Sequence, residues 1–571
     1  MAVLLVAGCG ASRLACHAVS AAPTRLDRRP DREQPVQVPV DGGEHGGRLD
    51  HVQLQQRGEP GQREQQVRLH HRVAVPRDQP VAHTAEGTLR GFLDRGLPVV
   101  RGVPYARPPV GPLRFAAPAP PERWDGVREA FTFGPVVPQS GPLPAAPTQG
   151  TDWLTLNVCT PDPGAAGLPV LVWIHGGAFI SGTSGDPLYD PTELARAGLV
   201  VVSVNYRVGA EGFALLEGAP ANRAFLDQIA ALEWVQLNIA GFGGDPGRVT
   251  IAGQSAGASS VAALLTMSRA RGLFRRAVAH TVGGNLCAPA LAAEVTAALA
   301  NRLGTAPTAA GLAEVDPWRL AAAVTDLGTA LPEHLARWGR LAQTGVATVP
   351  VVDGEVLAGE PWAALAAGRA AGIELLVGHT RDEFRLFSVL AGRHGTFTEE
   401  EARTALAQLA PRPDGPDAYR TALPDATPED LLEAVSSDAL FRMPSLHLAE
   451  GNAAAGGSSY LFELAFPAPA LGGVLGACHG LDVPPAFGTL DSPIGRHFLG
   501  DPPGPATVEL SCELQRAWIR FVSTGDPGWA RYEPERQLTR VFDTRSETVR
   551  YPEQACRDIW SGRTPTAFDL V

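Results

Sequence analysis

The chain has no lysine: all 48 of its basic residues are arginine, and 60 acidic residues leave a formal net charge of −12 at pH 7. Proteins that bind nucleic acid neutralise phosphates with a basic surface, so this acidic balance argues against a nucleic-acid partner. Long apolar runs are also missing, and none approaches the roughly 20 residues that a transmembrane helix needs. We therefore expect no membrane span.

Cysteine is scarce, with 7 in 571 residues. Five of them lie beyond residue 80: Cys159, Cys287, Cys478, Cys512 and Cys556. Cysteines scattered over a large core are more typical of reduced, buried side chains than of a disulfide framework. An export signal needs basic residues ahead of an apolar stretch; residues 1–8 have none, and the lipoprotein-like box ending at Cys9 follows only a short apolar segment. A cytoplasmic location is expected, and export stays open.

The first 80 residues contain no Phe, Trp, Tyr or Ile. They hold 11 Arg, 9 acidic residues and 5 of the 14 His, in an order with neither helical nor alternating periodicity. Such a segment cannot bury a core, so residues 1–80 are predicted to be a disordered or spurious N-terminal extension. Residues 81–571 are predicted to form one large domain with insertions.

Four apolar runs are continuous rather than alternating: residues 169–175, 199–206, 248–254 and 373–379. Strands that are apolar on both faces belong to a parallel sheet covered by helices. Between two of these runs, residues 223–239 repeat apolar side chains at helical spacing, as the crossover of such a sheet requires. The fold class predicted is α/β, with a central, mostly parallel sheet flanked by helices.

Two short extended stretches near the start of this domain, residues 87–93 and 97–106, are separated by an Asp-Arg-Gly turn. This pattern predicts a small N-terminal antiparallel hairpin.

Ser255 lies in a Gly253-x-Ser255-x-Gly257 motif between an apolar run and an Ala-rich helical stretch. A serine held in a strained strand-to-helix turn exposes its hydroxyl as a nucleophile, and the turn needs neighbours without bulk. In a chain with 63 glycines the motif alone is weak, and a serine at this place is also a common helix N-cap. The strand-turn-helix setting favours the nucleophile.

The sequence His175-Gly176-Gly177-Ala178 begins at the last residue of the apolar run 169–175. A tetrahedral intermediate needs backbone N–H donors aimed at its oxyanion, and adjacent glycines let the backbone come close. Gly176 and Gly177, together with the N–H of Ala256, are the predicted oxyanion hole. Taken alone, the motif would indicate an ordinary glycine turn.

The chain resembles the type-B carboxylesterases, the cholinesterase-like branch of the α/β-hydrolase superfamily that includes bacterial p-nitrobenzyl esterases. The likeness covers nearly all of residues 85–525 and is carried by RGVPYARPPVGPLRF, VWIHGGAF, GFGGDPGRVTIAGQSAGA and GACHGLDVPPAFG. It implies an α/β-hydrolase fold with helical insertions. It also implies a serine hydrolase that cleaves small-molecule carboxylic esters through an acyl-enzyme on Ser255, without a cofactor. Clustered metal ligands at short spacing are absent, so no metal site is expected.

In this resemblance the triad acid precedes the histidine in the chain. Residues 380–384, Thr-Arg-Asp-Glu-Phe, follow the apolar run 373–379 and match the family's acid loop at Glu383. The family usually has a glycine after this glutamate, where the chain has Phe384, so Asp382 stays an alternative acid.

The triad base is expected among the histidines after the acid, which are His394, His447, His479 and His497. His447 lies in a helix-like stretch, and His394 and His497 have arginine neighbours in polar stretches. His479 lies in a glycine-flanked loop, residues 476–480, and matches the family's histidine. The resemblance therefore implies a triad of Ser255, His479 and Glu383.

Two departures from the family are informative. Where eukaryotic relatives have cysteines that close an early loop, this chain has Val137 and Trp153, as a reduced compartment would tolerate. The loop between them, residues 139–151, has no aromatic residue to hold a quaternary ammonium group. Choline esters are therefore expected to be poor substrates, and Trp153 is the one residue near the loop that could replace the missing ring.

Two alternatives accompany this interpretation. A non-enzymatic, neuroligin-like adhesion or scaffold protein has the same fold, but such proteins lose a triad member, whereas all three positions are filled here. The same triad could also cleave amides or carbamates, because pocket shape sets the leaving-group preference. The natural substrate and the oligomeric state are left open by the sequence.

Overall fold

The computed structural model describes residues 79–141 and 145–571. The predicted extension, residues 1–80, lies almost wholly outside these ranges, so its disorder stays a prediction. None of the helices in the described ranges combines the length and the apolarity needed to cross a membrane.

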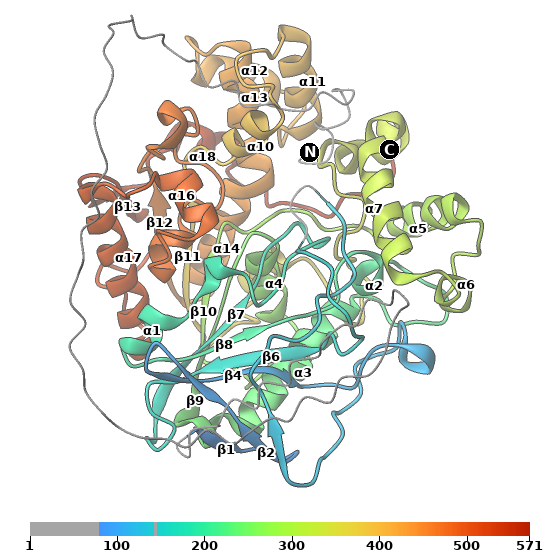
Figure 1. Cartoon of the computed structure of the whole chain (residues 1–571). Helices are drawn as coiled ribbons and strands as arrows, with labels where there is room; N and C mark the ends of the chain where they lie inside the picture. The colour runs from blue at the N-terminus through green and yellow to red at the C-terminus, as the bar shows by residue number, and fades with distance from the viewer. Residues whose placement is uncertain (1–78, 142–144) are drawn as a thin grey trace, which may run out of the picture. The chain divides into compact units, whose positions relative to one another are not determined.

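The strands of the described residues form two sheets (Figure 1). The smaller sheet has three strands: β1 (Val81–His83), β2 (Thr88–Arg90) and β5 (Val127–Glu129). The larger has eleven, in the spatial order β14-β13-β12-β11-β10-β9-β7-β8-β6-β4-β3. Their bounds are β3 (Phe92–Asp94), β4 (Leu97–Pro104), β6 (Thr155–Cys159), β7 (Leu168–Ile174), β8 (Val200–Val204), β9 (Gly244–Gln254), β10 (Arg276–His280), β11 (Glu374–Thr380), β12 (Ser458–Leu464), β13 (Leu538–Phe542) and β14 (Glu547–Arg550).

The centre of the large sheet is parallel. From β8 through β7 and β9 to β13 each strand runs parallel to its neighbour, while β3, β4, β6 and β14 pair antiparallel at the two edges. The four predicted strands are β7, β8, β9 and β11 of this parallel centre, and the predicted crossover is α3 (Arg223–Asn238).

The predicted hairpin is present, but it is divided between the sheets. β3 and β4 pair antiparallel around the expected turn and form one edge of the large sheet, whereas residues 88–90 pair with β1 in the small sheet. The chain passes from one sheet to the other at Gly91, where an added Cβ would lie 2.3 Å from the carbonyl oxygen of Val99. Only glycine allows so close an approach.

Both faces of the large sheet are covered by helices. On β7, Val170 and Val172 belong to the cluster of buried side chains that includes α3 and α4 (Ala256–Leu264). Leu171 and Trp173 belong instead to the cluster that includes α1 (Thr192–Arg196) and α17 (Pro505–Thr524). Because successive residues of a strand point to opposite faces, this burial explains the continuous apolar run.

Long helical insertions follow β10 and β11 (Figure 1). The remaining α-helices of the described residues are α2 (Gly209–Phe213), α5 (Pro289–Leu303), α6 (Ala309–Ala313), α7 (Pro317–Ala330), α8 (Leu335–Trp338), α9 (Pro361–Ala366), α10 (Arg385–Leu390), α11 (Glu399–Leu409), α12 (Gly415–Ala422), α13 (Pro428–Ser437), α14 (Met443–Ala454), α15 (Val483–Phe487), α16 (Pro493–Leu499) and α18 (Gln554–Trp560). A wider turn of helix, Asp438–Arg442, joins α13 to α14.

The carboxyl ends of the parallel strands meet at one edge of the sheet. Residue 175 follows β7, Ser255 follows β9, and residues 281 and 383 follow β10 and β11. In open α/β sheets this edge is where ligands bind.

Candidate active site

Ser255 occupies a strained turn between β9 and α4. Its backbone has φ 58° and ψ −123°, a conformation that is rare for a residue with a side chain. The two motif glycines permit the turn: a Cβ on Gly257 would lie 2.1 Å from the carbonyl oxygen of Ile174, and one on Gly253 would lie 2.5 Å from that of Gly257. Within the described residues the Ser255 side chain makes no capping hydrogen bond to α4, so it does not act as an N-cap.

His479 joins Ser255 to Glu383. The distance from His479 Nε2 to Ser255 Oγ is 3.0 Å, and that from His479 Nδ1 to Glu383 Oε2 is 2.6 Å. Glu383 is fully buried. Its second oxygen accepts hydrogen bonds from the Thr281 hydroxyl and from the Thr380 N–H, both at 2.7 Å. The carboxylate is thus fixed on both sides, with one oxygen left for the imidazole.

Asp382 faces the backbone of the His479 loop instead of the imidazole. Its carboxylate accepts the Ala477 N–H at 2.8 Å and an Arg381 guanidinium N–H at 3.0 Å, and its own N–H donates to the Ala477 carbonyl at 2.9 Å. Burial alone would raise the pKa of Asp382, but the hydrogen bonds from Arg381 and Ala477 outweigh burial and lower the pKa. Of the two acids weighed from the sequence, the structure therefore brings Glu383 to His479.

His394, another of the histidines weighed as the triad base, lies close to two glutamates of α13. The ligand atoms of His394, Glu429 and Glu433 lie within 4.8 Å of one another, a grouping that their distant sequence positions concealed. Glu433 already accepts hydrogen bonds from the Arg385 guanidinium at 2.6 Å and from the Ser388 hydroxyl at 3.0 Å. Glu433 is thus already occupied by residues of α10, and we interpret the grouping as part of the contact between α10 and α13.

The predicted oxyanion donors lie beside the nucleophile. A Cβ on Gly176 would come within 3.3 Å of the Ser255 Cβ. Burial and the nearby Asp186 charge raise the pKa of the Tyr189 phenol. A backbone interaction with Gly176 acts in the opposite direction and lowers this pKa, so the Gly176 backbone faces the phenol.

The next residue along the loop, Ala178, was not among the predicted donors. It has φ 54° and lines the same cavity as Gly177 and Ala256. Among the described residues, the N–H groups of Gly177, Ala178 and Ala256 donate no hydrogen bond to the protein. Three adjacent donors are therefore free to bind an oxyanion. The pattern Gly-Gly-Ala contained this signal, since alanine is nearly as small as glycine.

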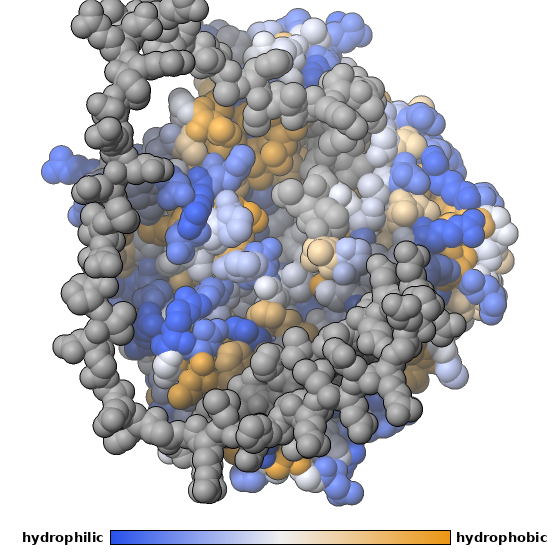
Figure 2. Space-filling model, in the orientation of Figure 1, coloured by the Kyte–Doolittle hydropathy of each residue, from blue (hydrophilic) through white to orange (hydrophobic). Residues whose placement is uncertain are grey.

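Ser255 and His479 open into a cavity of about 280 Å³. Apolar side chains from the α10 region and from the turn before α14 line much of it: Phe384, Leu386, Phe387, Leu390, Leu440 and Phe441. Two of these rings pack on the imidazole, with centroid distances of 4.7 Å from Phe441 and 5.3 Å from Phe387. Figure 2 shows apolar side chains gathered on the face that carries α10 and α13 in Figure 1.

Trp153 does not reach this cavity. It is 3% exposed, its indole N–H donates to the Gly150 carbonyl at 3.2 Å, and within the described residues no tryptophan lines the cavity.

The chain is similar to known esterases along most of its length. The family model described as "Carboxylesterase family" matches residues 78–556. The para-nitrobenzyl esterase of Bacillus subtilis (strain 168) is 35% identical over 497 residues, which cover 84% of this chain and 97% of that protein. The phenmedipham hydrolase of Pseudarthrobacter oxydans is 36% identical over 464 residues, covering 79% of this chain and 91% of that protein.

Solved structures give the same result for the fold. The crystal structure of a Geobacillus stearothermophilus carboxylesterase superposes with a TM-score of 0.74 at 35% identity, covering 84% of this chain and 99% of that one. A PNB esterase structure gives a TM-score of 0.73 at 33% identity, covering 84% and 100%. These likenesses confirm the predicted α/β-hydrolase fold.

Proposed function

Because the chain belongs to the carboxylesterase family, we propose that Ser255, His479 and Glu383 are the residues with which it hydrolyses esters. The resemblance to type-B carboxylesterases is confirmed, and the protein is a carboxylic ester hydrolase. One observation supports the residue assignment above all others. It is the pair of hydrogen bonds through the two nitrogens of His479, at 3.0 Å to the hydroxyl and 2.6 Å to the carboxylate.

Acylation begins when Ser255 Oγ attacks the ester carbonyl carbon and His479 Nε2 takes the hydroxyl proton. The carbonyl electron pair moves onto oxygen, which becomes an oxyanion. Glu383 accepts the hydrogen bond from Nδ1–H, which fixes the tautomer and stabilises the imidazolium. We propose that the free N–H groups of Gly177, Ala178 and Ala256 hold the oxyanion, and that Gly176 shapes the loop.

Collapse of this intermediate expels the alcohol. The imidazolium of His479 gives its proton to the departing oxygen, and the acyl group stays on Ser255. Water then attacks the acyl carbon while His479 takes a proton from it, and a second collapse returns the proton to Ser255 Oγ and releases the acid. His479 carries every proton, so the sequence of steps needs no cofactor.

The substrate that we propose is a small, uncharged ester. A cavity of about 280 Å³ with aromatic and aliphatic walls favours apolar acyl or alcohol groups. Relatives of this chain are named a para-nitrobenzyl esterase, a phenmedipham hydrolase and a fumonisin B1 esterase. Because these relatives have different names, we expect the walls of the cavity to set which substrates the protein prefers. Activity of the purified protein on a panel of esters, amides and carbamates would measure this preference.

A fluorophosphonate probe tests the nucleophile directly. The wild-type protein should be labelled at Ser255, and Ser255→Ala should lose both the label and several orders of magnitude of kcat on a p-nitrophenyl ester, while its melting temperature stays the same. Ser259, one helical turn along α4, offers a matched control because its hydroxyl is engaged with the Ser255 and Gly283 carbonyls. Labelling that persists in Ser255→Ala would refute the assignment.

A further inference from the structure

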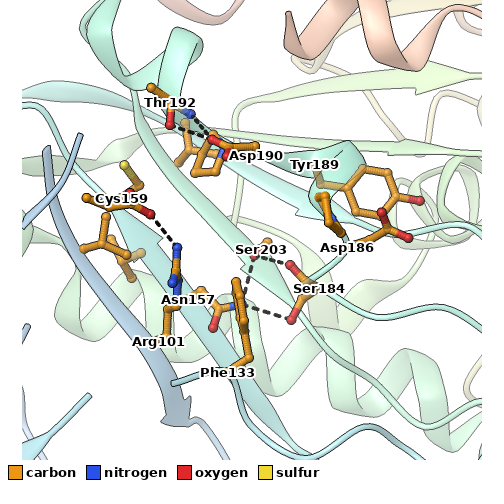
Figure 3. A pocket seen from close by; sticks show the side chains of 17 residues that line it. Arg101, Phe133, Asn157, Cys159, Ser184, Asp186, Tyr189, Asp190, Thr192 and Ser203 are labelled. Carbon is orange, nitrogen blue, oxygen red and sulfur yellow. Dashed lines mark hydrogen bonds and ion pairs between the residues drawn. The ribbon is translucent and has the colours of Figure 1, made fainter. Parts of the chain in front are cut away.

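A second cavity of about 210 Å³ lies next to the catalytic one. Its walls come from β4, β6, β8 and the loop before α1. Figure 3 shows Tyr189 and Asp186 on one side of it, with Arg101 and Phe133 across from them. Asp186 and Tyr189 line the catalytic cavity as well, so these two side chains form the wall between the cavities.

The charges around the second cavity leave one carboxylate without a cation. Asp94 is paired with Arg101 at 2.7 Å, and Asp190 is paired with Arg95. One oxygen of Asp186 accepts the Leu188 N–H at 2.9 Å, and among the described residues no arginine or histidine contacts its carboxylate. Burial raises the pKa of Asp186, and the hydrogen bond from the Leu188 N–H does not offset it. The cavity therefore has one uncompensated negative charge.

The other polar groups of the second cavity bond to one another. The Asn157 amide nitrogen donates to the Ser184 and Ser203 hydroxyls, both at 3.0 Å, and the Ser203 hydroxyl donates to the Ser184 carbonyl at 3.0 Å (Figure 3). Asp186 is thus the one carboxylate on the wall of this cavity that has no cation partner among the described residues.

Two aromatic rings border the same space. Phe133 is 44% exposed and packs against Gly185, where an added Cβ would lie 2.9 Å from the ring. The Arg101 guanidinium lies 4.5 Å from the Phe133 centroid, so this ring already accepts one cation. Tyr189 provides the second ring, beside Asp186 (Figure 3).

We propose that this second cavity is a binding site for a primary alkylammonium group. The ammonium would donate to Asp186 and supply the charge that this carboxylate lacks, since an unpaired, partly buried charge is costly. The alkyl chain would lie against the apolar rings of Phe133 and Tyr189. An anion meets a repulsive carboxylate there, and a neutral alcohol of the same length does not neutralise the charge.

Binding of n-butylammonium chloride, measured by isothermal calorimetry at constant ionic strength, tests the site without using esterase activity. The wild-type protein should bind n-butylammonium, and n-butanol should bind about tenfold more weakly or not at all. Asp186→Asn should weaken n-butylammonium binding about tenfold, because it removes the ion-pair partner from a partly buried site. Glu122→Gln removes an equal charge from a side chain that is 78% exposed, and it should bind as the wild type does.

Two further measurements locate the site, because Asp186 also faces the catalytic cavity. Phe133→Ala changes only the second cavity and should weaken binding while esterase activity persists. Protein whose Ser255 has been phosphonylated should still bind n-butylammonium, since the adduct fills the catalytic cavity alone. Equal binding of n-butylammonium by wild type and Asp186→Asn would overturn the proposal. So would loss of binding on phosphonylation, which would place the amine beside Ser255.

Discussion

The two acidic neighbours that follow β11 hold different parts of the same histidine loop. Glu383 bonds the imidazole of His479 at 2.6 Å, whereas Asp382 bonds the backbone of Ala477 at 2.8 Å. Gly476 fits this arrangement because a Cβ there would lie 2.5 Å from an Asp382 carboxylate oxygen. Glu383 therefore fixes the tautomer of His479, and Asp382 fixes the position of the loop that carries it.

Glu383→Gln should lower kcat on p-nitrophenyl acetate by roughly 10³- to 10⁴-fold, because a neutral amide favours the wrong tautomer of His479. Asp382→Asn should cost much less, since an amide oxygen can still accept the Ala477 N–H. Steady-state kinetics of the two variants, with circular dichroism to check folding, make the comparison. A larger loss of kcat in Asp382→Asn than in Glu383→Gln would show that Asp382, and not Glu383, is the acid of the triad.

Thr281 is a residue whose role the sequence pattern did not reveal. It directly follows β10, is fully buried and has φ 61°, a conformation that is a genuine outlier for a β-branched side chain. Its hydroxyl donates to Glu383 Oε1 at 2.7 Å. Strain of this kind persists only where the surroundings enforce it, and here it points the hydroxyl at the triad acid.

Thr281→Val keeps the shape of this side chain and removes the hydroxyl. It should lower kcat about tenfold and shift the lower limb of the pH–rate profile, because Glu383 loses one of its charge-assisted hydrogen bonds. Thr281→Ser restores the hydroxyl and should recover most of the rate. An unchanged pH–rate profile in Thr281→Val would mean that the residue only fills space.

At the scale of the elements, the sequence predicted best where burial is two-sided. The continuous apolar runs of β7, β8, β9 and β11 and the crossover α3 are confirmed, because both faces of a strand or a long face of a helix must be apolar there. The division of the hairpin was missed, since it depends on the pairing of β2 with β1 and on the close approach of Gly91 to Val99, neither of which the sequence pattern shows. Thr281 was missed because backbone φ and side-chain direction leave no periodic trace in a sequence.

The loop before β6 is the basis of our prediction for esters of cationic alcohols. Residues 139–151 contain no aromatic side chain, and Trp153 is buried and bonded to Gly150. A stacked indole contributes up to about 2 kcal/mol to holding a quaternary ammonium group, and this chain has none at its catalytic cavity among the described residues. The ammonium subsite that we propose does not replace it, because a quaternary nitrogen has no N–H to donate to Asp186.

Butyrylthiocholine should therefore be no better a substrate than S-(3,3-dimethylbutyl) thiobutyrate, a neutral thioester of the same shape. The comparison of kcat/KM at equal salt isolates the charge, because the two share an acyl group and a thiol leaving group. A preference for butyrylthiocholine by tenfold or more would mean that Asp186 or an aromatic ring of the catalytic cavity attracts the quaternary ammonium group without the missing indole.

For the whole molecule, the cysteines bear on the reduced state expected from their scatter over a large core. All five in the described residues are free; Cys159, Cys287, Cys478 and Cys556 are buried and Cys512 is exposed. Burial raises the pKa of Cys159 and Cys287 to about 12, so their thiols stay protonated and unreactive. The cytoplasmic location stays a prediction.

The start of the folded domain can be tested by truncation at two points. β1 pairs with β2, Gly91 donates its N–H to the Pro80 carbonyl at 2.8 Å, and Ala85 donates to the Asn238 side chain of α3 at 2.7 Å. A chain that begins at Gln79 keeps all of these contacts. It should retain the melting temperature and the kcat of the full chain if residues before it add no buried contacts.

A chain that begins at Thr88 loses β1 and the bond to Asn238, and it should melt at a lower temperature by several degrees. Its kcat at 25 °C should stay close to that of the full chain, because the small sheet contributes no side chain to the catalytic cavity. Differential scanning calorimetry of the three proteins, with p-nitrophenyl acetate kinetics, separates the two effects. If the chain from Gln79 already melted as low as the chain from Thr88, the preceding residues would hold stabilising contacts and the domain would begin earlier than the composition indicates.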